Sequence, residues 1–165
     1  MTTQSSPTKT LTVTTPSDTE VVLTRVFNAP RTLVFDAHTK PEHVKRWFGL
    51  RGSTVPVCDI DFRVGGAYRF VLREADGSEM PIRGIYREIV APERLVYTEI
   101  FEQFEEIGGV PLVNITLEER DGKTTLTSTT LYDSKEIRDA VIGSGMEEGA
   151  AETYDRLAEL LETMA

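Results

Sequence analysis

The sequence has few of the residues that disulfides, metal centres and nucleophilic sites require. Cys58 is the only cysteine among the 165 residues, so an intrachain disulfide and a thiolate zinc cluster are both excluded. The two histidines, His38 and His43, have no third metal ligand near them, and we therefore expect no metal site. No serine or cysteine lies in a motif such as G-x-S-x-G, so no hydrolase triad is indicated, and we expect no cofactor.

Basic residues and long apolar runs are also scarce. The chain carries 18 lysines and arginines against 27 aspartates and glutamates, which gives a formal net charge of −9. We expect no nucleic-acid partner, because no basic run offsets the repulsion of a polyanion. No apolar stretch approaches the roughly 20 residues that span a bilayer, and the N-terminus lacks the apolar core of a signal peptide. Together with the lone cysteine, these features favour a cytoplasmic protein without membrane insertion.

The remaining composition is that of one soluble domain. We expect it to cover residues 10–165, after a flexible Ser/Thr/Pro-rich segment at residues 1–9. Two strands, at 10–15 and 20–27, are followed by two short helices, and turn signals then separate neighbouring strands from residue 54 onward. The pattern predicts an α+β fold with an antiparallel sheet of six to seven strands.

The last segment of the chain predicts a long amphipathic helix over residues 145–164. Met146, Ala150 and Tyr154 lie on its apolar face, and Ser144 with Glu147 has the spacing of a capping box. Such a helix is only about 10 Å across and cannot cover a wide concave sheet. We therefore expect a cavity between helix and sheet, with a tightly packed core as the alternative.

Four stretches of the sequence, in this order, resemble one known family. They are LTRVFNAPRTLVFDAHTKPEHVKRWFG, DIDFRVGGAYRFVL, GIYREIVAPERLVYTE and SGMEEGAAETYDRLAELLE. The chain resembles the START-like SRPBCC superfamily from about residue 10 to 164, and within it the branch named after the activator of heat-shock-protein-90 ATPase, C-terminal domain. The resemblance implies a helix-grip fold, in which a curved antiparallel sheet surrounds a long C-terminal helix with a hydrophobic cavity between them.

The resemblance also limits the candidate functions to three. The first is binding of a hydrophobic or amphipathic small molecule in the internal cavity. The second is an enzyme like the polyketide cyclases and aromatases of the superfamily, which orient a reactive chain and supply one or two polar groups. The third is a protein-interaction or co-chaperone-like module, including a homodimer, which an exposed apolar patch and a filled core would support.

Aromatic residues supply the first cavity candidates. The resemblance places Trp47 and Phe48 near the cavity mouth, where they are expected to form its rim or to seal the short helices against the sheet. Tyr68 and Phe70 share one strand parity, opposite Arg69, and are therefore expected to point inward.

The strand around Tyr97 places a carboxylate among aromatic side chains. Tyr97, Glu99 and Phe101 share one parity, and a carboxylate on that apolar face is costly unless it is paired or hydrogen-bonded. We consider Arg83 and Tyr86 as its partners. With a raised pKa, Glu99 could serve as an acid or base, whereas at a strand end it would be solvated or structural.

The C-terminal helix supplies the last candidates, Met146, Ala150 and Tyr154. In the family, a large aromatic, usually tryptophan, directly follows the glycine that corresponds to Gly149, whereas here that position is Ala150. We expect the missing indole to widen the cavity, with Tyr154 or a sheet aromatic filling part of the gap. Gly149 costs roughly 1 kcal/mol relative to alanine in a helix, which we interpret as a site of close chain approach.

Overall fold

The computed structural model describes residues 11–164, so the segment at residues 1–9 lies outside the described residues. Within them, nine strands form one antiparallel sheet in the order β1-β2-β9-β8-β6-β5-β4-β3, and β7 pairs with β5 beside this path. The strands are β1 (Thr12–Thr14), β2 (Glu20–Phe27), β3 (Thr54–Ile60), β4 (Ala67–Arg73), β5 (Glu79–Val90), β6 (Arg94–Thr98), β7 (Ile100–Phe101), β8 (Leu112–Arg120) and β9 (Lys123–Leu131).

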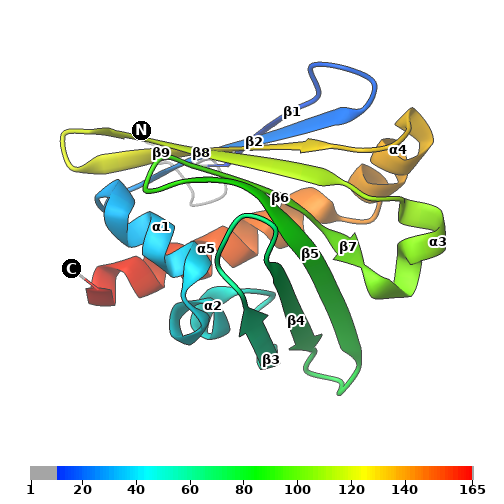
Figure 1. Cartoon of the computed structure of the whole chain (residues 1–165), viewed down its shortest axis with the longest axis horizontal. Helices are drawn as coiled ribbons and strands as arrows, with labels where there is room; N and C mark the ends of the chain where they lie inside the picture. The colour runs from blue at the N-terminus through cyan, green and yellow to red at the C-terminus, as the bar shows by residue number, and fades with distance from the viewer. Residues whose placement is uncertain (1–10, 165) are drawn as a thin grey trace, which may run out of the picture.

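The helices lie on the concave side and at the two ends of this sheet. They are α1 (Arg31–Thr39), α2 (Pro41–Trp47), the short 3-10 helix η2 (Glu102–Phe104), α3 (Glu105–Gly108), α4 (Lys135–Gly143) and α5 (Met146–Met164). The sheet bends over α5, with α1 and α2 near one end of that helix and α4 near the other (Figure 1). The expected α+β helix-grip fold is confirmed.

The strand count differs from the expected six to seven. β1, within the strand predicted at 10–15, has only three residues and pairs only with β2, and β7 is an additional strand of two residues that pairs with β5. Sequence alternation is a weak signal over so few residues, whereas the longer strands were all indicated by it. The difference leaves the predicted topology class unchanged.

The hydrophobic core is concentrated at the C-terminal half of α5. Leu157, Leu160 and Leu161 are buried there against α1 and α2. The Trp47 indole belongs to this core and donates a hydrogen bond from Nε1 to the Ala37 carbonyl at 2.8 Å. In the N-terminal half of α5, Ala151 is the one buried residue, so that half contributes little to the core.

The start of α5 differs from the predicted capping box. The Ser144 hydroxyl donates to the Val141 carbonyl at 2.6 Å and therefore completes α4, and α5 begins at Met146. Gly145 separates the two helices with a φ of 89°, a conformation that L-residues rarely adopt. The predicted N-cap role of Ser144 is wrong because a left-handed glycine ends one helix directly before the next begins.

Gly149 does not mark a close chain approach, contrary to the sequence-based interpretation. A Cβ at this position would lie 3.7 Å from Leu50 Cδ2, which is an ordinary van der Waals contact. Gly149→Ala is therefore expected to stabilise the protein by about 0.5–1 kcal/mol through helix propensity, and to raise the Tm by about 2–4 °C. Thermal unfolding checks this. Gly145→Ala is the opposite control, since its positive φ predicts a loss of stability, and an unchanged Tm in Gly149→Ala would contradict the interpretation.

Candidate functional site

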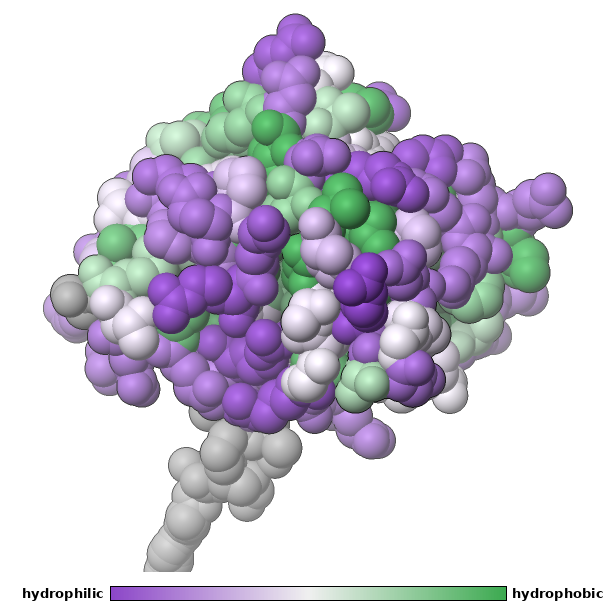
Figure 2. Space-filling view, turned by 90° about the horizontal axis from the view of Figure 1, so that it is seen from below, coloured by the Kyte–Doolittle hydropathy of each residue, from purple (hydrophilic) through white to green (hydrophobic). Residues whose placement is uncertain are grey.

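A cavity of about 530 Å³ lies between the concave face of the sheet and the N-terminal half of α5. Its volume falls in the range of small-molecule sites. The structure therefore has a cavity here rather than a tightly packed core. Seen from below, the molecule also shows apolar side chains gathered in a hollow that hydrophilic residues surround (Figure 2).

The structure brings together all but one of the residues that the sequence placed at a cavity. Those that line it are Trp47, Phe48, Tyr68, Phe70, Tyr86, Tyr97, Glu99, Phe101, Met146, Ala150 and Tyr154. They come from α2, the strands β4 to β7, and α5. Helix and sheet therefore both contribute to its wall, as the fold predicts.

Arg83 is the exception, and its placement beside Glu99 is corrected. Its guanidinium lies on the outer face of the sheet and donates to both carboxylate oxygens of Glu105, at 2.8 and 2.6 Å. Arg83 and Tyr86 are three residues apart on β5 and therefore face opposite sides of the sheet. Tyr86 is buried and points inward.

Aromatic side chains make up a large part of the cavity wall. All five tyrosines of the chain, at positions 68, 86, 97, 132 and 154, line it. The Tyr68 ring lies 5.5 Å from Tyr86 and 5.6 Å from Tyr97, between ring centroids. Across the cavity, Tyr154 stacks on Trp47 with the planes 19° apart. These contacts hold the rings in a continuous surface of offset and edge-to-face pairs.

The backbone that carries Glu99 is held by two hydrogen bonds. The Tyr68 hydroxyl donates to the Thr98 carbonyl at 2.7 Å, and the Glu99 amide donates to the Pro111 carbonyl at 3.0 Å. Gly84 makes the first contact possible, because a Cβ there would lie 1.8 Å from the Thr98 carbonyl oxygen. The strand order therefore fixes the position from which the Glu99 side chain enters the cavity.

Glu99 is the charged group in this aromatic environment. Burial raises the pKa of its carboxyl to about 7, and no hydrogen bond or opposite charge from the protein offsets that effect. After burial itself, the Glu99 charge is the next cause of the raised pKa values of Tyr68, Tyr97, Tyr132 and Tyr154. Glu99 is half-buried and lines the cavity with no ion pair or hydrogen bond to its carboxylate from the described residues, so the paired alternative is not what the structure shows, and a raised pKa is the alternative that fits it.

Several lining residues were missed from the sequence, and alternation could have found some of them. Tyr132 follows β9 but continues the inward parity of Ser128 and Thr130, which also line the cavity. Phe104 follows from no periodic pattern, because it lies in the 3-10 turn η2 after the strands end. Its side chain is 51% exposed at the cavity mouth.

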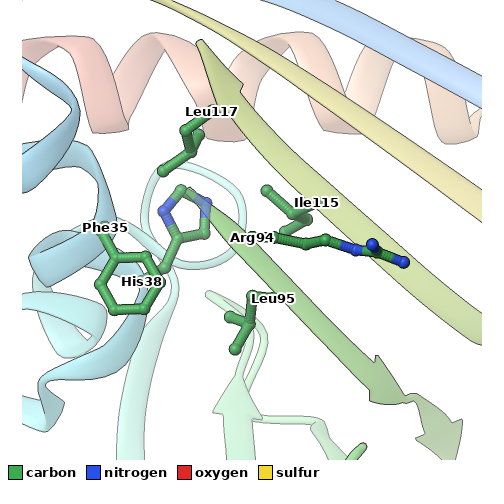
Figure 3. Close-up of a pocket in the computed structure, with 6 residues that line it drawn as sticks. All are labelled: Phe35, His38, Arg94, Leu95, Ile115 and Leu117. Carbon is green, nitrogen blue, oxygen red and sulfur yellow. The ribbon is translucent and has the colours of Figure 1, made fainter. Parts of the chain in front are cut away.

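His38 is another lining residue that was missed, and burial favours its neutral form. Its ring is surrounded by Phe35, Leu95, Ile115 and Leu117, while the Arg94 guanidinium points away (Figure 3). Burial lowers the pKa of the imidazole, and Nδ1 lies 2.8 Å from the Val34 carbonyl oxygen. Nδ1 therefore carries the proton, which leaves buried Nε2 without a hydrogen-bond partner. The helical spacing of four from Val34 to His38 is the signal that could have placed His38 inward.

Arg83 acts on the cavity from outside, through the segment at its mouth. With Glu105 it ties the start of α3 to the sheet, and Arg69 ties η2 to the sheet through Glu102 at 2.9 Å. Phe101 and Phe104, in and beside this segment, line the mouth. Ion pairs on the outer face therefore hold the aromatic rim in position.

Removing this tie is expected to change exchange rates rather than stability. Arg83→Gln breaks an exposed pair worth about 0.2–1 kcal/mol, so probe entry and release should both accelerate by up to about fivefold. Stopped-flow measurement of Trp47 fluorescence with an apolar probe checks this. Arg73→Gln is the matched control, because Arg73 pairs with the Glu79 side chain on the same sheet, whereas η2 reaches Glu79 only through its backbone carbonyl, which accepts from Gln103. Equal rates in both variants would contradict the role of Arg83.

Other reactive groups do not add to the site. Burial raises the pKa of the Cys58 thiol to about 11, so it is protonated at neutral pH, as expected of an inert cysteine. Within residues 11–164 no three His, Cys, Asp or Glu side chains gather in a group that could hold a metal ion. Over the same range, no helix has the length and apolar character needed to cross a bilayer.

Comparison with known proteins agrees with this architecture. The model of a family described as Activator of Hsp90 ATPase homolog 1-like protein matches residues 28–162. No curated protein matches the chain.

Solved structures of bacterial proteins share the fold over most of the chain. A protein from Rhodobacter sphaeroides is 28% identical with a TM-score of 0.86, covering 93% of this chain and 98% of that one. A protein from Staphylococcus epidermidis is 27% identical with a TM-score of 0.80, covering 93% of this chain and 95% of that one. Protein Ms6760 from Mycobacterium smegmatis is 25% identical with a TM-score of 0.82, covering 92% and 96%.

Proposed function

The chain belongs to the family of Activator of Hsp90 ATPase homolog 1-like proteins, and on this basis we propose that it binds a hydrophobic or amphipathic small molecule in its internal cavity. The observation that carries the proposal is the cavity of about 530 Å³ with its aromatic wall. An apolar space of this size would be costly to leave empty. A ligand that enters it removes apolar surface from water, which is worth roughly 25 cal/mol per Å². The exposed aromatic rim at Phe101 and Phe104 supplies an entry path.

Native mass spectrometry tests the proposal directly. Protein purified from its own host under mild conditions should retain a small molecule, and apolar compounds from a lipid and polyketide-like library should raise its Tm. Trp47 gives a second readout, because it is the only tryptophan and lines the cavity. Repeated recovery of empty protein, with no thermal shift and no change in Trp47 fluorescence across the library, would contradict the proposal.

A second candidate function, acid or base catalysis of the cyclase type, is favoured by Glu99. A general acid or base works best with a pKa near the operating pH, and burial brings that of Glu99 to about 7. The cavity would then orient a reactive chain while Glu99 transfers a proton. Turnover of a polyketide-like substrate that is lost in Glu99→Gln, with binding retained, would support catalysis, whereas binding without turnover would favour the first function.

We also propose that the protein is cytoplasmic and that it can form a homodimer. The apolar residues near the mouth that are exposed, such as Ile107 at 75% and Phe104 at 51%, are the surface on which a second copy could dock. Sedimentation equilibrium over a range of protein concentrations distinguishes a monomer from a dimer. A monomer at all concentrations would remove the interaction alternative in its homodimeric form.

A further inference from the structure

We propose that the ligand of this cavity is a monocation: a protonated or quaternary ammonium group seated at Glu99, on an apolar body that fills the aromatic-walled space. This inference rests on the proposed function and names the chemical class of its ligand. It follows from the charge of the lining, the absence of an internal partner for Glu99, and the arrangement of the aromatic rings.

The side chains that line the cavity are unbalanced in charge. Glu99 and Glu74 contribute carboxylates, and the lining includes no lysine and no arginine. His38 is the remaining basic group, and burial keeps it neutral by lowering its pKa. An ionised carboxylate in an apolar space needs an opposite charge or hydrogen bonds, so the missing partner is expected to come from the ligand.

The protein does not supply that partner from behind the wall. Arg25, on the inner side of β2, pairs with Asp155 of α5 at 2.6 Å. Arg83 pairs in the sheet with Ile100, the residue after Glu99, but its side chain lies on the outer face with Glu105. Within the described part of the chain, the Glu99 carboxylate makes no ion pair, and burial is the sole cause of its raised pKa.

Aromatic rings from both layers of the fold line the same cavity as this carboxylate. The four tyrosines whose pKa values the Glu99 charge raises are Tyr68 on β4, Tyr97 on β6, Tyr132 after β9 and Tyr154 on α5. Their rings remain neutral, and the electron-rich faces of neutral rings attract a cation. A carboxylate among such rings is the combination that binds an ammonium group.

Other ligand classes fit this lining less well. An anionic head group would meet the Glu99 and Glu74 carboxylates with no basic side chain to receive it. A neutral ligand would leave Glu99 without a counter-charge whenever it is ionised. The net charge of −9 also favours the approach of cations over anions.

Binding of a permanent cation should depend on pH through Glu99. A quaternary ammonium ion does not titrate, and the four tyrosines near Glu99 have raised pKa values and stay protonated at pH 6–8. Burial lowers the pKa of His38 and so favours its neutral form, and any titration of His38 is common to the parent and Glu99→Gln. Ionisation of Glu99 therefore controls the affinity, which is expected to fall about tenfold between pH 8 and pH 6.

The test uses three probes with one apolar body. They are (3-phenylpropyl)trimethylammonium, its neutral carbon isostere with a tert-butyl group, and 3-phenylpropylsulfonate. Binding is measured at pH 8 and pH 6 by calorimetry and by Trp47 fluorescence. The ammonium probe should bind the parent protein at least about tenfold more tightly than the isostere at pH 8, and the sulfonate more weakly than either.

Two variants separate the site from the general charge of the protein. Glu99→Gln should weaken the ammonium probe by about tenfold or more at pH 8, abolish its pH dependence, and change the isostere by less than about twofold. Glu118→Gln removes the same charge from an exposed position of β8 and should change neither probe.

Each outcome decides the proposal. If the isostere or the sulfonate binds as tightly as the ammonium probe, or if Glu118→Gln weakens the ammonium probe as much as Glu99→Gln, the monocation inference is overturned while cavity binding stands. If no probe binds by either measurement, the inference and the proposed function fail together. The predicted order of the three probes, lost only in Glu99→Gln, supports the inference.

Discussion

Replacing Ala150 by tryptophan is expected to abolish the binding of apolar probes and to raise the free energy of unfolding by about 1–2 kcal/mol. Ala150 lines the cavity from α5, and a larger side chain there points into open space rather than into a packed core. Burial of the indole against the aromatic wall stabilises the folded state, less the rotamer entropy that it loses. The same indole occupies volume that a ligand would need.

Chemical unfolding and probe titration measure these two effects, and the neighbouring residue is the matched control. Ala151 is 8% exposed and does not line the cavity, so Ala151→Trp forces an indole into packed side chains and should destabilise the protein by about 1–3 kcal/mol or more. If Ala150→Trp destabilises the protein as strongly as Ala151→Trp, the space beside Ala150 is already occupied, and the cavity does not extend to this turn of α5.

The contrast between these adjacent alanines shows what a sequence pattern can resolve. Helical spacing placed Ala150 and Tyr154 on one face of the last helix, and the resemblance to relatives with an aromatic at the position of Ala150 indicated missing volume. Strand parity in the same way placed Tyr68 and Glu99 inward. Patterns of period 3.6 and 2 report the direction of a side chain, and direction sufficed for all but one of the residues that the sequence proposed, while other lining residues were missed.

The two errors have different sources. Arg83 is one of two partners that the sequence offers to Glu99, although its alternation with Tyr86 along β5 alone indicates the outer face, where it pairs with Glu105. Gly149 was interpreted as a close contact, yet the distance to Leu50 is set by the loop after α2 and follows from no local pattern. Contacts between distant segments require the three-dimensional packing.

The existence of the cavity also follows from the three-dimensional packing and from no local pattern. Trp47 of α2 and Tyr154 of α5 stack on each other, but whether side chains also fill the space up to the strands depends on the separation between α5 and the sheet, which no single segment encodes. The sequence gives their types, and the packing leaves about 530 Å³ open between them. The environment of Glu99, with no partner from the protein, could be recognised only once that space was defined.

The second large effect is the pH dependence of the stability that Glu99 causes, and stability is expected to fall as the pH rises. The pKa of Glu99 is about 7 in the folded protein against 4.5 for an ordinary glutamate, so the folded state binds this proton more tightly than the unfolded state. Its contribution to stability is therefore full below about pH 4.5 and is lost as the pH rises through about 7. Because one pKa unit corresponds to about 1.4 kcal/mol, the loss amounts to about 3 kcal/mol.

Glu99→Gln removes this dependence, because glutamine has the shape of the protonated acid and does not titrate. At pH 8 the variant is expected to be more stable than the parent by up to about 3 kcal/mol, and at pH 4 the two should be equally stable. His38 opposes the trend in both proteins, since its lowered pKa makes stability fall as the pH drops below about 6.5, so it cancels from the difference.

Urea unfolding of both proteins between pH 4 and pH 8 gives the difference directly, with Glu118→Gln as the control for loss of one exposed negative charge. A constant difference across that range would mean that Glu99 is ionised and solvated, and the monocation site would then lack its buried carboxylate. We expect the difference in free energy of unfolding between Glu99→Gln and the parent to grow with pH. We expect it to vanish when (3-phenylpropyl)trimethylammonium saturates the parent protein, which would link the stability of the fold to the ligand that the cavity accepts. The same residue would then weaken the empty protein and strengthen the occupied one, because the charge that burial penalises is the charge that the ligand neutralises.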